Sequence, residues 1–170
     1  NSLGRIKVSD IEILSQMFKE HVIVPKSEEH KKYYINLVEK KAADSNVIIR
    51  SLPFDSLIIN LDEFTLSNHL FEGKQGECKC ADYIIISEEK KCILYIEIKK
   101  RKDFEHNVVK QLQGAFCFIK YCQEIGKQFW GKADFLAGYK NRFIGILHTG
   151  ISISKQRTRS DSSGKCHDTP

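Results

Sequence analysis

The chain has no apolar run near the ~20 residues that a membrane-spanning helix needs, so we do not expect a membrane partner. No secretory signal precedes the first expected helix, and no Asn-x-Ser/Thr glycosylation site occurs. The six cysteines lack the regular spacing of a disulfide framework, which favours reduced thiols. These absences predict an intracellular protein, cytoplasmic or nuclear, in a reducing compartment.

Internal repeats and a second block of apolar sequence are also missing. The 170 residues are enough for one domain with a sizeable core. We predict a single domain over residues 1–150 and a basic, polar segment over residues 151–170. The charge balance, 27 Lys and Arg against 22 Asp and Glu, is compatible with a nucleic-acid partner without requiring one.

The most informative stretch is 78–102. Two apolar runs, 83–86 and 92–98, flank the charged tetrad 88–91, and this pattern predicts a β-hairpin. Both strands carry apolar residues on both faces, which is typical of interior strands in a layered α/β sheet. A carboxylate at the end of such a strand is costly to leave unpaired, so it is usually bonded, bridged or bound to a metal.

The hairpin register brings polar side chains together at its open end. If Glu89 and Lys90 form the loop, Asp82 lies opposite Glu97, with Cβ atoms about 5 Å apart. Lys99 shares their face because strand side chains alternate with period two. Two carboxylates at this separation suit a hard cation such as Mg²⁺.

Asp82 followed by Glu97-Ile98-Lys99 resembles the motif of the PD-(D/E)XK nuclease superfamily, which includes restriction endonucleases and Holliday-junction resolvases. Ala81 stands where the motif has proline. The resemblance implies an α/β fold with a three-layer, restriction endonuclease-like αβββαβ core and a mixed central sheet. It also implies a Mg²⁺- or Mn²⁺-dependent nuclease. Asp82, Glu97 and the Ile98 carbonyl would hold the metal, while Lys99 would position water and offset charge on phosphorus.

The resemblance extends to two further candidates. Family members often add an acidic residue from the first core helix, and Glu39 is our candidate, with a solvated helix charge as the alternative. Many relatives place a glutamine on the helix after the motif, which Gln111 or Gln113 would match. We prefer Gln111 because it borders the apolar stripe of that helix.

Three basic residues follow the motif directly: Lys100, Arg101 and Lys102. They would contact phosphates in a nucleic-acid complex, or they form a solvated strand end. We expect a nucleic-acid partner, DNA before RNA, and two copies could pair to cut both strands. The alternatives are an RNA endonuclease of related fold and a non-catalytic domain that binds nucleic acid or protein.

A structural zinc site is a separate hypothesis. Cys78, Cys80, Cys166 and His167 supply the thiolates and imidazole that close a four-ligand zinc site. The Cys-x-Cys spacing is tighter than usual for zinc, and isolated thiols are the default interpretation.

The remaining patterns predict the order helix, strands, helix, strand. Ser9 caps a first helix reaching residue 21, and Ser27 caps a second helix ending near residue 44. Short strands are expected at 47–49, 57–61 and 68–71, a long helix at 103–124 and a further strand at 143–147.

Overall fold

The computed structural model describes residues 8–38, 46–62, 70–99 and 104–147. Its helices and strands follow one another along the chain as α1 (Asp10–Met17), the 3₁₀ turn η1 (Glu20–Val22), β1 (Ser27–Glu29), β2 (Lys32–Val38), β3 (Asn46–Leu52), β4 (Leu57–Asn60), β5 (Tyr83–Ser87), β6 (Cys92–Lys99), α3 (Phe104–Phe129) and β7 (Lys140–Leu147).

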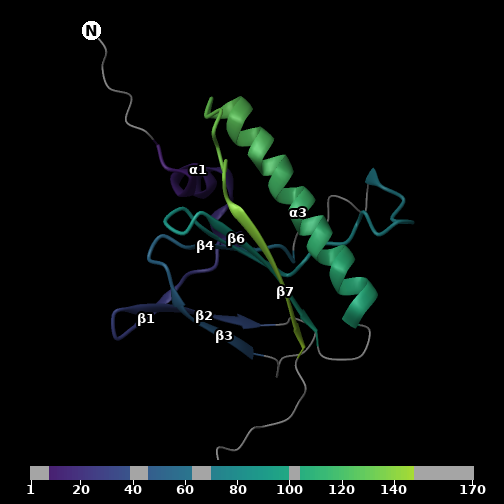
Figure 1. The fold of residues 1–170 in the computed structure, drawn as a ribbon, viewed down its shortest axis with the longest axis horizontal. Coiled ribbons are helices and arrows are strands. Elements are labelled where there is room, and N and C mark those ends of the chain that lie inside the picture. The colour runs from purple at the N-terminus through teal and green to yellow at the C-terminus, as the bar shows by residue number, and fades with distance from the viewer. Residues whose placement is uncertain (1–7, 39–45, 63–69, 100–103, 148–170) are drawn as a thin grey trace, which may run out of the picture.

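The strands form two sheets. In the four-stranded sheet the order is β4-β5-β6-β7, and in the three-stranded sheet it is β1-β2-β3. Strands β4, β5 and β6 are antiparallel neighbours, whereas β7 runs parallel to β6. Parallel neighbours need a crossover, which α3 supplies. The prediction of an α/β fold with a mixed sheet is therefore confirmed (Figure 1).

Strands β4, β5 and β6 of the four-stranded sheet are buried on both faces, as their apolar residues predict, whereas most residues of β7 are exposed. One face packs against α1 and α3, and the other packs against the three-stranded sheet. The expected alternation is confirmed along the hairpin. Ile84, Ile86, Ile93 and Tyr95 lie on the helical side, and Tyr83, Ile85, Ile96 and Ile98 lie on the other.

Helix α3 crosses this sheet as the expected long helix. Its predicted stripe is buried at Val108, Leu112, Ala115, Ile119 and Cys122, with Phe116 partly buried. Gly126 does not end the helix, which continues to Phe129. Within the described ranges, no helix is both long enough and apolar enough to cross a membrane.

The second predicted helix, 27–44, is wrong: its described part forms β1 and β2. Ser27 with two following acidic residues resembles a capped helix start, but burial in this segment has period two. Ile35 and Leu37 are buried while Asn36 between them is exposed. His30 and Lys31 both have positive φ and turn the chain back. The central sheet is therefore covered by strands, not a helix, on this face.

Two other boundaries differ from the prediction. Ser9 caps α1 through a capping box with Glu12, as expected, but the helix ends at Met17 and not at residue 21. The strand expected at 68–71 is wrong at its described end, because Leu70 is helical and Phe71 lies in a bend. Residues 68 and 69 lie outside the described ranges.

Candidate active site

The hairpin register is the predicted one. Tyr83 pairs with Ile96 at the open end of β5 and β6, so Asp82, just before β5, lies opposite Glu97. The Asp82 amide donates to Glu97 Oε2 at 3.1 Å. In return, the Ile98 amide donates to Asp82 Oδ2 at 2.7 Å. Each carboxylate is thus held by the backbone of the other's strand.

Lys99 completes the group. Its Nζ lies 2.6 Å from Glu97 Oε1, and its side chain remains 29% exposed while that of Glu97 is fully buried. Period-two alternation places Glu97 and Lys99 on the side of the sheet that faces α3. The structure therefore brings Asp82, Glu97 and Lys99 together at one end of the central hairpin.

Asp82, Glu97 and Lys99 together carry less positive than negative charge when both carboxyl groups are ionised. The pKa of Glu97 is raised to about 7, first by burial and then by the negative charge of Asp82. The Lys99 ammonium and the Asp82 amide act in the opposite direction without cancelling the rise. Two carboxylates and a single ammonium leave a net negative charge that an added cation would offset.

Helix α3 contributes Gln111 beside the hairpin. Its Nε2 donates to the Cys80 carbonyl at 3.4 Å, two residues before Asp82. Its Oε1 is buried and has no hydrogen-bond partner among the described residues. Gln113, the alternative, is exposed. The preference for Gln111 agrees with its position, while its role stays a prediction.

Gly114 is a residue that sequence reasoning missed. A Cβ at this position would lie 1.7 Å from the Lys79 carbonyl oxygen, because α3 crosses the chain just before β5 at very short range. Only glycine permits this approach, which seats Gln111 against Cys80. A glycine in the middle of an otherwise favourable helical pattern was the available signal.

We expect Gly114→Ala to destabilise the protein by about 1–3 kcal/mol, as overpacking of a close contact usually does. The sign is diagnostic, because glycine to alanine in an exposed helix normally stabilises by up to ~1 kcal/mol. Urea unfolding would measure the change, with the exposed neighbour Gln113→Ala as control. A stabilised Gly114→Ala protein would contradict the close crossing.

Several predicted site residues lie outside the described ranges: Glu39, Lys100, Arg101, Lys102, Cys166 and His167. The argument for Glu39 is weakened because the preceding residues form β2 and not a helix. For the zinc hypothesis, burial raises the pKa of the Cys80 thiol to about 12, which disfavours the thiolate that zinc binds. Both hypotheses stay predictions.

The first helix does carry a buried acid, but it belongs to the other end of the hairpin. Asp10 Oδ1 lies 2.5 Å from Lys132 Nζ, and the Asp10 amide donates to Glu88 Oε2 in the hairpin turn. These contacts attach α1 to the hairpin turn through Glu88 and to the segment after α3 through Lys132. Asp10 is therefore a structural ion-pair partner and not a member of the candidate site.

Asp82 and Glu97 are the residues that would hold a divalent cation of the Mg²⁺ type. Their oxygen donors match the preference of Mg²⁺. The negative charge of Asp82, which after burial is the second cause of the raised Glu97 pKa, is one that a bound cation would offset. Among the described residues, no group of three or more His, Cys, Asp or Glu side chains could hold a metal. Mg²⁺ commonly uses only one or two carboxylates and completes its shell with water and substrate phosphate.

Comparison of the chain with family models, with curated proteins and with solved structures finds no match. A function for this chain is therefore inferred from the residues of the hairpin and from their geometry.

Proposed function

We propose that this domain is a metal-dependent nuclease that hydrolyses phosphodiester bonds. One observation carries the proposal: Asp82, Glu97 and Lys99 converge at the end of a buried hairpin, linked by two backbone hydrogen bonds and an ion pair. A fully buried glutamate beside a second carboxylate lowers the stability of the folded state, so a role in folding alone does not explain it. Perturbed groups of this kind concentrate at functional sites.

Each residue has a distinct role in this proposal. Asp82 and Glu97, with the Ile98 carbonyl, would hold Mg²⁺ or Mn²⁺, which when bound polarises the phosphate and lowers the pKa of water. The Lys99 ammonium orients the attacking water and offsets negative charge that develops on phosphorus. The Glu97 contact fixes this ammonium before substrate arrives. Gln111 keeps the segment before Asp82 in place through the Cys80 carbonyl.

We further propose that α1, β4, β5, β6, α3 and β7 form a restriction endonuclease-like αβββαβ core. What supports this is the order of these elements and the mixed sheet. The three-stranded sheet β1-β2-β3 would then be an insertion between α1 and β4. It covers the face of the central sheet opposite α3.

DNA is the first substrate to test, with RNA as the alternative and two paired copies as the form that would cut both strands. The rival proposal is a non-catalytic domain that binds nucleic acid or protein. The position of Lys99 favours catalysis, because its side chain is 29% exposed and lies against a fully buried carboxylate, within reach of a substrate from solvent.

The purified protein should cleave nucleic acid in Mg²⁺ or Mn²⁺ and become inactive in EDTA. We would incubate it with single- and double-stranded DNA and RNA, side by side, and resolve the products by gel electrophoresis. Internal cuts in a circular substrate would identify an endonuclease. Cleavage that persists in EDTA would contradict the role of the metal, and no cleavage of any substrate would favour the non-catalytic binding domain.

A further inference from the structure

A second feature of the surface adjoins the candidate site. A groove of about 650 Å³ lies between the outer side of α3 and the loop after residue 70. Its apolar walls are formed by Leu70, Phe71, Cys117, Phe118 and Tyr121. This volume falls in the range of small-ligand sites, about 300–1,000 Å³.

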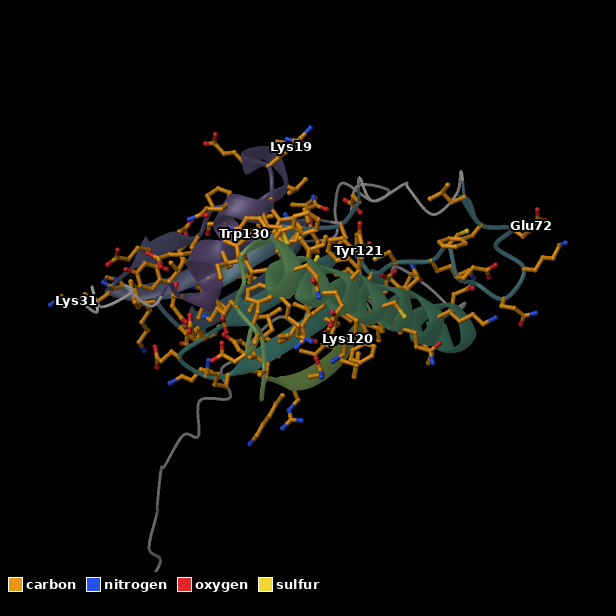
Figure 2. The ribbon with its side chains drawn as sticks, turned by 90° about the horizontal axis from the view of Figure 1, so that it is seen from above. Lys19, Lys31, Glu72, Lys120, Tyr121 and Trp130 are labelled. Atoms are coloured by element: carbon orange, nitrogen blue, oxygen red, sulfur yellow. The ribbon has the colours of Figure 1, made fainter. Side chains whose placement is uncertain are left out.

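The aromatic rings of this groove are unusually open to solvent. The exposed fraction is 58% for Phe71 and 64% for Tyr121, and these residues come from different parts of the chain. Figure 2 shows Tyr121 on a different side of α3 from its neighbour Lys120. Grouped exposed apolar residues of this kind mark binding surfaces. Two exposed rings that line one groove suit a flat, π-bonded ligand.

The polar lining of the groove contains two lysines, one glutamate and two glutamines. Lys79 and Lys110 both line it, and among the described residues neither forms an ion pair with a carboxylate. Glu77 also lines it, but its carboxylate accepts hydrogen bonds from the Gly73 and Gln75 amides at 3.0 and 2.8 Å. Lys79 Nζ also donates a hydrogen bond to Asn107 Oδ1. The groove thus places the ammonium groups of Lys79 and Lys110 beside aromatic rings, the combination that binds single-stranded nucleic acid.

The position of the groove connects it to the hairpin. Gly114, whose backbone meets the Lys79 carbonyl, lines the groove, and the next contact along the chain joins Gln111 to Cys80. Asp82 follows two residues later. A strand with a base in the groove would thus lie beside the candidate site.

We propose that this groove receives an unpaired nucleobase of a single-stranded substrate, stacked on Phe71 and Tyr121, with neighbouring phosphates on Lys79 and Lys110. This inference rests on the proposed nuclease function and narrows its substrate class to single-stranded or locally unpaired nucleic acid. The sugar, ribose or deoxyribose, is left to the experiment.

The test is equilibrium binding in EDTA, measured by fluorescence anisotropy with labelled single strands of about 12 nucleotides, within the ~4–16 nucleotides that such surfaces cover. Phe71→Ala and Tyr121→Ala should each weaken binding by about 5- to 150-fold, the usual effect of losing one stacked base. Phe129→Ala is the matched control: it lies on the same helix, is 79% exposed, and is outside the groove.

Two further binding measurements separate the contribution of base stacking from that of the phosphate contacts. An oligonucleotide made of abasic sites should bind the wild type more weakly than the normal single strand does. Wild type and Tyr121→Ala should bind this oligonucleotide equally, because it has no base to stack on the ring. Lys110→Ala should weaken all single strands and reduce the salt dependence of binding, because a phosphate contact is lost. DNA and RNA versions of the same sequence show which sugar is preferred.

The proposal is overturned if Phe71→Ala and Tyr121→Ala bind like Phe129→Ala, if a duplex binds as tightly as the single strand, or if the wild type binds neither. Binding through the groove by a protein without nuclease activity would refute the proposed catalysis while leaving the groove in place, so the two failures are distinguishable.

Discussion

Lys99→Ala is expected to lower the rate of phosphodiester cleavage by ~10²–10³ while leaving nucleic-acid binding largely intact. Negative charge grows on phosphorus only as the transition state forms, so the ammonium acts on rate more than on affinity. Losing one well-placed electrostatic group usually costs this much. Single-turnover cleavage on the preferred substrate, with binding measured in EDTA, would give both quantities.

Lys90→Ala is the matched control for this variant. Lys90 lies in the turn of the same hairpin, is exposed, and pairs with Glu89 at the end remote from Asp82. It should cleave like the wild type. Far-ultraviolet circular dichroism must show that Lys99→Ala is folded, because the change leaves the buried Glu97 without its cation. A folded, fully active Lys99→Ala protein would falsify the catalytic assignment.

Asp82→Ala should be equally inactive for a different reason, and manganese separates the two. Asp82 would act through metal affinity, so raising the Mn²⁺ concentration should restore part of its activity by mass action. The same excess should not help Lys99→Ala, which retains both carboxylates. Equal rescue of both variants would contradict the division of roles.

The sequence predicted the site best where local pairing decides geometry. A short charged loop between two apolar strands leaves few registers, so the approach of Asp82 to Glu97 followed from residue numbers. The burial of both strand faces followed from their composition. The stripe of α3 followed from its 3.6-residue period, which remains unbroken over many turns.

The errors occur where local preference and tertiary packing disagree. The residues of β2 carry apolar side chains at spacings compatible with either a helix or a strand, and a strong helix cap before them favoured the helix. The segment forms a strand because it pairs with β3 and buries Ile35 and Leu37 against the four-stranded sheet. The crossing at Gly114 depends on how α3 sits over the chain, which no local pattern specifies.

The groove beside α3 was beyond sequence reasoning for the same reason. Phe71 and Tyr121 are far apart in the chain, and each by itself resembles an ordinary apolar residue. Only the packing of the loop against α3 places their exposed rings around one cavity. The two lysines likewise resemble a solvated face until their position on the groove is known.

The buried carboxylate at the hairpin end should make the metal-free protein less stable as pH rises. The Glu97 pKa is about 7 in the folded protein, against 4.5 as the ordinary value. Between these values the folded state binds the extra proton, so the free energy of unfolding falls with increasing pH. The contribution is complete below about 4.5 and lost above about 7, and it amounts to on the order of 3 kcal/mol.

Urea unfolding in EDTA, from pH 4.5 to 8, would measure this loss as the difference between the wild type and Glu97→Gln. Groups distant from Glu97 contribute equally to both proteins and cancel in the difference. Glu89→Gln, which changes an exposed carboxylate in the turn of the same hairpin, is the control, and its difference from the wild type should not show a loss of this size. A cation held by Asp82 and Glu97 opposes this loss of stability, so Mn²⁺ should stabilise the wild type more at pH 8 than at pH 5. Mn²⁺ should stabilise Glu97→Gln much less than the wild type at either pH. A difference curve that stays flat between pH 4.5 and 7 would show that the pKa of Glu97 is not raised. The proposed metal site would then lose the electrostatic property on which it depends.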